Sequence, residues 1–401
     1  MAVDEAGRLP VIRAEEPAKA AFLNDPRTRG ILVQIVLIVA LVAFAGWIIN
    51  NTAENLQRAN VASGYGFLDE RAGFEIGQSP IPYSPDRSYG YAIYVGFLNT
   101  LVVAAIGIVA ASIIGFLVGI GRLSKNWLIR QLSTVYVEVF RNIPPLLVIL
   151  FWYFGVIAVL PAPRDAIDTG LGITFSNRGA IMPRLLLEEG SWLIFAALFV
   201  AVVAVIGIAR WAKARQMATG QRFPLLRWAL ALLIGLPLVA YFAAGLPLGV
   251  EFAEETRFGR RGGFQVQPEF LALILALSIY TASFIAEIVR AGILAVSHGQ
   301  TEAASSLGLR AGPTLRLVVI PQALRVIIPP LTSQYLNLTK NSSLAVAIGY
   351  ADLVAVGGTV LNQTGQAIEV VAIWMIVYLT LSLATSFFMN WFNRSMALVE
   401  R

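Results

Sequence analysis

The sequence predicts an all-α membrane protein with about eight transmembrane helices. Hydrophobic residues make up 57% of the 401 positions and charged residues only 13%, about half the charged fraction of an ordinary soluble domain. The apolar residues gather in runs of about 20, which is long enough to cross about 30 Å of hydrocarbon as helices. Polar loops rich in Pro, Gly and charged residues separate these runs.

Composition and missing motifs exclude several classes of protein. There is no cysteine and a single histidine, His298, which argues against disulfides, thiolate chemistry and Cys- or His-based metal centres. The sequence contains no GxxxxGK[ST] phosphate loop, no GxSxG elbow and no HExxH pair. We therefore expect no catalytic residue, no metal site and no cofactor in this chain, and we do not expect an enzyme.

The apolar runs give the order of the expected helices. A polar tail covers residues 1–30, and a folded polar loop follows the first helix up to Gly90. The fourth and fifth helices form an inserted pair without a recognisable motif, joined by a stretch, 210–227, with five basic residues and no acid. The expected spans are Ile31–Ile49, Tyr91–Gly121, Ile143–Leu160, Ser191–Ala209, Trp228–Leu248, Glu269–Arg290, Leu315–Asn337 and Ile368–Phe388.

The charge distribution predicts the orientation in the membrane. Eight spans place both termini on one side, and that side carries about twice as many Lys and Arg residues as the other. The positive-inside rule then places both termini and the loop 297–321 in the cytoplasm. The net charge of +6 therefore reflects membrane topology and gives no reason to expect nucleic-acid binding.

The polar stretch Ser297–Pro321 carries signals for a short helix outside the bilayer. Ser297 and Gln300 have the spacing of a capping box, and Gly308 stands where a helix of about ten residues would end in a left-handed conformation. Small side chains at Ala303 and Ala304 give this helix a surface that a partner could approach closely. A second helix is expected to begin at 312–313, a Gly-Pro pair.

The spacing of Glu302-Ala303-Ala304, Gly308 and Pro321 resembles the EAA loop of ATP-binding-cassette importer permeases. The resemblance implies that this loop is a coupling helix, which docks on a cytoplasmic ATPase subunit that binds the ATP. Residues 280–290, YTASFIAEIVR, resemble the branch that carries polar amino acids, and residues 71–77 and 175–179 resemble general L-amino-acid importers.

The resemblance also implies an architecture and a set of partners. A type I importer permease core would consist of 91–160 and 268–401, with an extra N-terminal helix and loop at 31–90 and the inserted pair at 161–267. The implied partners are the ATPase, a second similar permease and a periplasmic amino-acid-binding protein, at the bacterial inner membrane.

Two polar clusters are candidates for the substrate pathway. Tyr280, Ser283 and Glu287 share one helix face, where Glu287 either attracts a substrate ammonium group or pairs with Arg290. The stretch 340–343, made of Lys340, Asn341, Ser342 and Ser343, either offers a cation and hydrogen bonds to a carboxylate or is a helix end with a snorkelling lysine.

Two other classes of function remain open at this point. An ion-gradient-driven secondary carrier of amino acids would need no ATPase, but the sequence shows no convincing inverted repeat. A membrane-embedded enzyme is disfavoured because a catalytic set is missing. Copurification of an ATPase with the chain would distinguish these alternatives.

Overall fold

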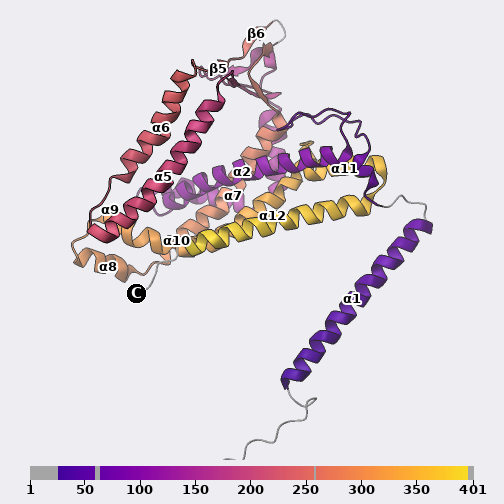
Figure 1. Cartoon of the computed structure of the whole chain (residues 1–401), viewed down its shortest axis with the longest axis horizontal. Coiled ribbons are helices and arrows are strands. Elements are labelled where there is room, and N and C mark those ends of the chain that lie inside the picture. Colours follow the sequence, from indigo (N-terminus) through magenta and orange to yellow (C-terminus); the bar gives the residue numbers. More distant parts are fainter. Residues whose placement is uncertain (1–25, 59–63, 257–258, 396–401) are drawn as a thin grey trace, which may run out of the picture. The chain divides into compact units, whose positions relative to one another are not determined.

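The computed structural model describes residues 26–58, 64–256 and 259–395, and it divides the chain into two units, Met1–Tyr65 and Gly66–Arg401 (Figure 1). The first unit contains helix α1, Pro26–Arg58. Its apolar segment is exposed along its whole length, as expected of a helix surrounded by lipid. Most of the predicted tail, residues 1–25, lies outside the described residues.

The second unit is a helical bundle with small strands in its loops (Figure 1). Besides the α-helices it contains π-helical segments at 151–157 and 315–319, and 3₁₀ turns at 66–69, 163–165 and 342–348. The α-helices are α2 (Tyr89–Gly121), α3 (Trp127–Arg141), α4 (Pro145–Leu150), α5 (Trp192–Thr219), α6 (Leu225–Ala243), α7 (Pro268–Leu294), α8 (His298–Ser306), α9 (Ala311–Thr314), α10 (Ile320–Asn341), α11 (Leu353–Thr364) and α12 (Ala367–Ser395).

Helix α7 is the centre of the bundle, and 61% of its apolar segment is buried. It packs along α2, where Gly115 and Gly119 allow the two backbones to approach closely. A Cβ atom on Gly115 would lie 2.6 Å from Ile285, and one on Gly119 would lie 2.7 Å from the carbonyl oxygen of Ala286. The GxxxG spacing of Gly115 and Gly119 therefore marks a close contact between two helices here.

Seven helices among the described residues could each cross a membrane, or eight if a bent pair counts as one span. This confirms the predicted number, but the third span differs from the prediction of Ile143–Leu160. Pro145–Ile157 alone is only about 20 Å long. It continues from α3 through a bend of 110°, because the prolines at 144 and 145 do not donate the backbone hydrogen bonds that would extend α3.

The polar loops of the inserted pair contain strands that the sequence did not predict. Strand β3 pairs with β8, which joins the loop before α5 to the loop after α6. Arg260 adds ion pairs to Asp168 and Glu255, each at 2.8 Å. The strands are β1 (Ile167–Asp168), β2 (Thr174–Ser176), β3 (Gly179–Met182), β4 (Arg184–Leu187), β5 (Leu248–Glu251), β6 (Glu254–Thr256), β7 (Gly259–Arg261) and β8 (Phe264–Val266).

Two apolar clusters hold the second unit together. The larger lies among α2, α4, α7 and α10. The smaller lies between the loop before α2 and the helices α11 and α12, and it contains Phe67, Leu353 and Val360.

Helix α11 lies between the seventh and eighth expected spans, where the sequence predicted no helix. Glycines and polar residues interrupt the apolar pattern of this stretch. Asp352 caps α11 by accepting a hydrogen bond from the Ala355 amide at 2.8 Å.

Candidate functional site

Helix α8 forms the predicted short helix of the loop 297–321, and its C-terminus is a Schellman motif. The amide of Gly308 donates to the Ser305 carbonyl at 2.9 Å, and the amide of Leu309 donates to the Ala304 carbonyl at 3.1 Å. Gly308 has a φ of 78°, as its position in the sequence predicted. The capping box does not form, since Ser297 occupies the N-cap without a side-chain cap bond.

One face of α8 is exposed, and the opposite face is attached to the bundle. Ala304 is buried, and the Gln322 amide on α10 donates to Gln300 Oε1 at 3.2 Å. Glu302 and Ala303 are exposed, and Glu302 contacts His298 at 3.0 Å. The segment that connects α8 to α10 begins at Leu307, which follows α8 directly and is 82% exposed. It ends at Pro321, which lies in the first turn of α10.

Glu287 lies in a network of arginines near the end of α7. Its carboxylate accepts two hydrogen bonds from Arg290, at 2.6 and 3.1 Å, and it also pairs with Arg122 at the end of α2. Arg122 in turn lies 3.6 Å from Glu138 on α3. The structure thus contains the Glu287–Arg290 pair, one of the two alternatives that the sequence left open, and adds Arg122, which the spacing along one helix could not reveal.

A polar cavity of about 240 Å³ lies between α4, α7 and α10. The guanidinium of Arg141 stands 5.6 Å from the ring of one lining residue, Phe284. The lining residues are Pro145, Tyr280, Thr281, Phe284, Gln334, Asn337 and Asn341.

The structure separates the other predicted pathway residues. Ser283 is fully buried and donates to the Tyr280 carbonyl at 2.6 Å, and Ser342 is fully buried and donates to the Thr339 carbonyl at 2.8 Å. Lys340 and Ser343 line a different cavity, of about 330 Å³, beside α12. Tyr280 and Asn341, which come from different predicted clusters, therefore meet in the cavity between α4, α7 and α10, whereas Lys340 and Ser343 do not reach it.

The sequence did not predict Gln334 and Asn337 as residues of this site. Together with the predicted Asn341 they follow an i, i+3, i+7 pattern on α10, which places the three on one helix face. That pattern could have identified Gln334 and Asn337. Leu307 carried no signal, because an apolar residue after a helix end is ordinary. Within the described ranges, no group of three or more His, Asp or Glu could hold a metal ion.

A bundle of apolar helices exposed on their outer surfaces, with a polar cavity among them and a short helix outside them, is typical of a multi-pass membrane protein. The chain belongs to the family of binding-protein-dependent transport system inner membrane components, whose model matches residues 107–398. It is thus a multi-pass permease of the inner membrane. The resemblance to the polar-amino-acid branch of ATP-binding-cassette importer permeases is confirmed.

Three relatives match nearly the whole chain. The chain is 61% identical to the general L-amino acid transport system permease protein AapQ of Rhizobium johnstonii, covering 94% of this chain and 95% of the relative. It is 51% identical to the putative amino-acid ABC transporter permease protein YhdX of Escherichia coli, over 97% and 99% of the two chains. It is 42% identical to the glutamate/glutamine/aspartate/asparagine transport system permease protein BztB of Rhodobacter capsulatus, over 97% and 99%.

Proposed function

We propose that the chain is the permease subunit of an ATP-driven amino-acid importer, and that it receives its driving force through α8. The observation that carries the proposal is the construction of α8, which has an exposed face, an exposed Leu307 side chain directly after it and a hydrogen bond to Gln322 of α10. The relatives at 61% and 51% identity are named as amino-acid transport permeases, which supports amino acids as the substrate class.

The attachment of α8 to α10 gives a mechanical route to the substrate path. When ATP draws two ATPase subunits together, a docked α8 would move with them. The Gln300–Gln322 hydrogen bond would pass this movement to α10, which lines the polar cavity. ATP would thereby shift the population between a path open outward and a path open inward.

The cavity between α4, α7 and α10 suits a small zwitterion. The amides of Gln334, Asn337 and Asn341 offer donors to a carboxylate and acceptors to an ammonium group. Tyr280 adds a hydroxyl and an aromatic face. We assign Lys340 and Ser343, in the neighbouring cavity, to a second position along the same path.

The proposal includes the partners that the sequence motifs implied. ATP is bound by a separate cytoplasmic ATPase, a second similar permease completes the path, and a periplasmic binding protein delivers the amino acid. Both termini and α8 lie on the cytoplasmic side. The chain has no ATPase site of its own.

Reconstitution tests the proposal directly. Proteoliposomes that contain this chain, its paired permease and the ATPase should accumulate labelled amino acids only with internal ATP and the external binding protein. The ATPase should copurify with the chain, and Leu307→Asp should remove it. Uptake by this chain alone, driven by an ion gradient and insensitive to nucleotide, would refute the proposal.

A further inference from the structure

The inserted helices α5 and α6 form a hairpin that contacts the bundle little. None of the residues of α6 is buried, and in α5 only Ala201 and Ala212 are buried. The outer surfaces of both helices are apolar and exposed, so the hairpin faces lipid wherever no other chain covers it.

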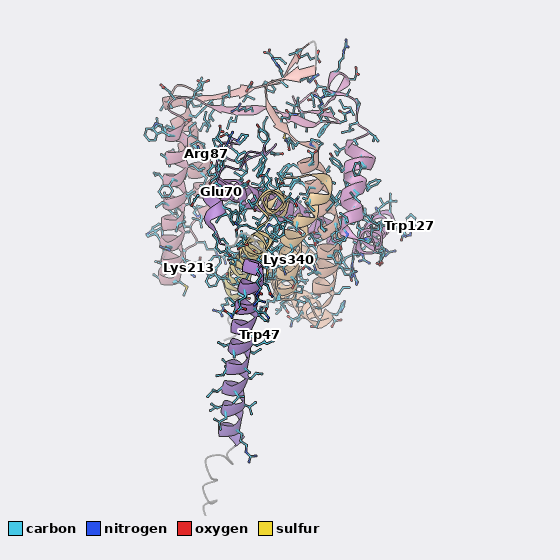
Figure 2. All side chains as sticks on the ribbon, turned by 90° about the vertical axis from the view of Figure 1, so that its right-hand side faces the viewer. Trp47, Glu70, Arg87, Trp127, Lys213 and Lys340 are labelled. Atoms are coloured by element: carbon cyan, nitrogen blue, oxygen red, sulfur yellow. The ribbon has the colours of Figure 1, made fainter. Side chains whose placement is uncertain are left out.

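The turn of this hairpin carries one sign of charge. The region 192–243 contains no acidic residue, and its basic residues gather where α5 ends and α6 begins. Figure 2 shows one of them, Lys213, near the end of the hairpin away from the strands. We call these five exposed residues the basic turn: Arg210, Lys213, Arg215, Arg222 and Arg227.

The basic turn differs from the two arginines that surround Glu287 in the bundle. Arg122 and Arg290 are held by Glu287, and they therefore serve the bundle itself. In the part of the chain that the structure describes, Arg210, Lys213, Arg222 and Arg227 form no ion pair. Their charges are available to an anion from outside the chain.

Aromatic rings lie directly beside these charges. The rings of Trp211 and Phe223 meet edge to face at 5.3 Å, and Phe223 stacks on Trp228 at 6.4 Å. The guanidinium of Arg215 lies 5.4 Å from the Trp211 ring, and it donates to Gln221 at 2.9 Å. Trp rings favour the level of the lipid headgroups, so these rings place the basic turn where lipid phosphates lie.

We propose that the basic turn binds the phosphate headgroups of anionic lipids and thereby anchors the inserted hairpin at the membrane surface. Charge complementarity selects this ligand, because five cations without a counter-charge lie beside an aromatic cluster at the end of two apolar helices. Guanidinium groups also match phosphate oxygens with two parallel hydrogen bonds. The anchor accounts for a hairpin that packs little against its own bundle.

The test measures lipid binding by the full chain in a neutral detergent. The probes are fluorescent phosphatidylglycerol, fluorescent phosphatidylcholine and inorganic phosphate as a competitor. Each juxtamembrane Lys or Arg strengthens binding to anionic lipid by about fivefold. We expect R222Q/R227Q to weaken phosphatidylglycerol binding by at least about tenfold, and R222K/R227K to retain most of it.

A matched control neutralises two exposed arginines near the other end of the insertion, R184Q/R261Q, and should leave binding unchanged. An equal loss in R184Q/R261Q and R222Q/R227Q would overturn the proposal, as would equal affinity for phosphatidylcholine. Competition by millimolar inorganic phosphate alone would assign the site to free phosphate instead of lipid. If R222Q/R227Q lost the copurifying ATPase but still bound phosphatidylglycerol, the basic turn would be a surface for a protein partner. That result would also overturn the proposal. An unchanged melting temperature in neutral detergent verifies that the variants fold.

Discussion

The exit of the chain from α8 offers a sharp test of coupling, because the geometry isolates one physical variable at Gly308. This residue has a φ of 78°, and a Cβ atom added to it would meet nothing within 4 Å. A larger side chain therefore finds open space, and the cost of Gly308→Val comes from the left-handed backbone alone. That backbone costs an L-residue about 1–2 kcal/mol, and a β-branched residue is least suited to it.

This cost predicts the size of the functional effect. When this backbone cost of about 1–2 kcal/mol destabilises the conformation in which α8 is docked, the docked population decreases by about 5–30-fold. A difference of 1.4 kcal/mol corresponds to a factor of about ten. ATP-driven uptake per reconstituted complex should fall by a similar factor. Gly308→Asn should retain most of the uptake, because asparagine tolerates the left-handed region.

The assay is uptake of a labelled amino acid into proteoliposomes, normalised to the complex content, with ATP hydrolysis measured in parallel. Gly312→Val is the matched control. A Cβ atom added to Gly312 would also meet nothing within 4 Å, but the φ of this residue is not positive. Normal uptake by Gly308→Val would refute the reasoning, and so would equal impairment of Gly308→Asn and Gly308→Val.

Three further predictions concern the bundle. Glu287→Gln should lower the melting temperature and the yield, corresponding to about 1–3 kcal/mol for loss of charge-assisted hydrogen bonds, with uptake per complex unchanged. Gly115→Ala should destabilise the protein by about 1–3 kcal/mol through overpacking, whereas Gly207→Ala, which has no atom within 4 Å of the new Cβ, should not. Asp352→Asn should stabilise the protein at pH 8 by on the order of 3 kcal/mol. The measurement is the melting temperature of the variant and of the wild type, each at pH 4 and at pH 8.

The sign of the Asp352 prediction follows from its burial. Asp352 lies outside the candidate spans, and burial raises its pKa from 3.8 to about 6. The folded protein then binds more protons than the unfolded chain between about pH 4 and pH 6, so this group makes stability fall as pH rises through that window. Asparagine keeps the cap of α11 and removes this dependence. A wild-type curve as flat as that of Asp352→Asn would contradict the prediction.

Clear outcomes would also contradict the other two predictions. Altered selectivity among amino acids in Glu287→Gln, at normal yield, would assign the carboxylate to the substrate path. Equal stability of Gly115→Ala and Gly207→Ala would show that α2 and α7 have room to separate.

Local signals in the sequence were sufficient to predict the conformation of the loop 297–321. A glycine after a run of small residues predicts a left-handed helix end, and Gly308 has that conformation because the two Schellman hydrogen bonds span only neighbouring residues. Likewise, Pro145 begins a helix as expected, since proline in a first turn loses no helical hydrogen bond. Such features depend on a few consecutive residues and can be recognised in them.

Features formed by distant residues could not be predicted in this way. The loop strands gave no alternating pattern, because β3 and β8 are short and meet only when the α5–α6 hairpin brings residues about 85 apart together. The polar pathway clusters separated for the same reason: helix rotation buries Ser283 and Ser342 and turns Asn341 toward Tyr280.

The amino-acid sequence alone determined the membrane class, the number of membrane-spanning helices and the short helix of the loop 297–321, since hydrophobic length and local backbone preferences act within short segments. Tertiary packing decided that Arg122 reaches Glu287, that the amides of α10 face the cavity, and that Leu307 remains exposed. These contacts depend on how each helix is rotated against its neighbours. That rotation is set by close approaches such as Gly115 on Ile285, which exist only when both helices are in place.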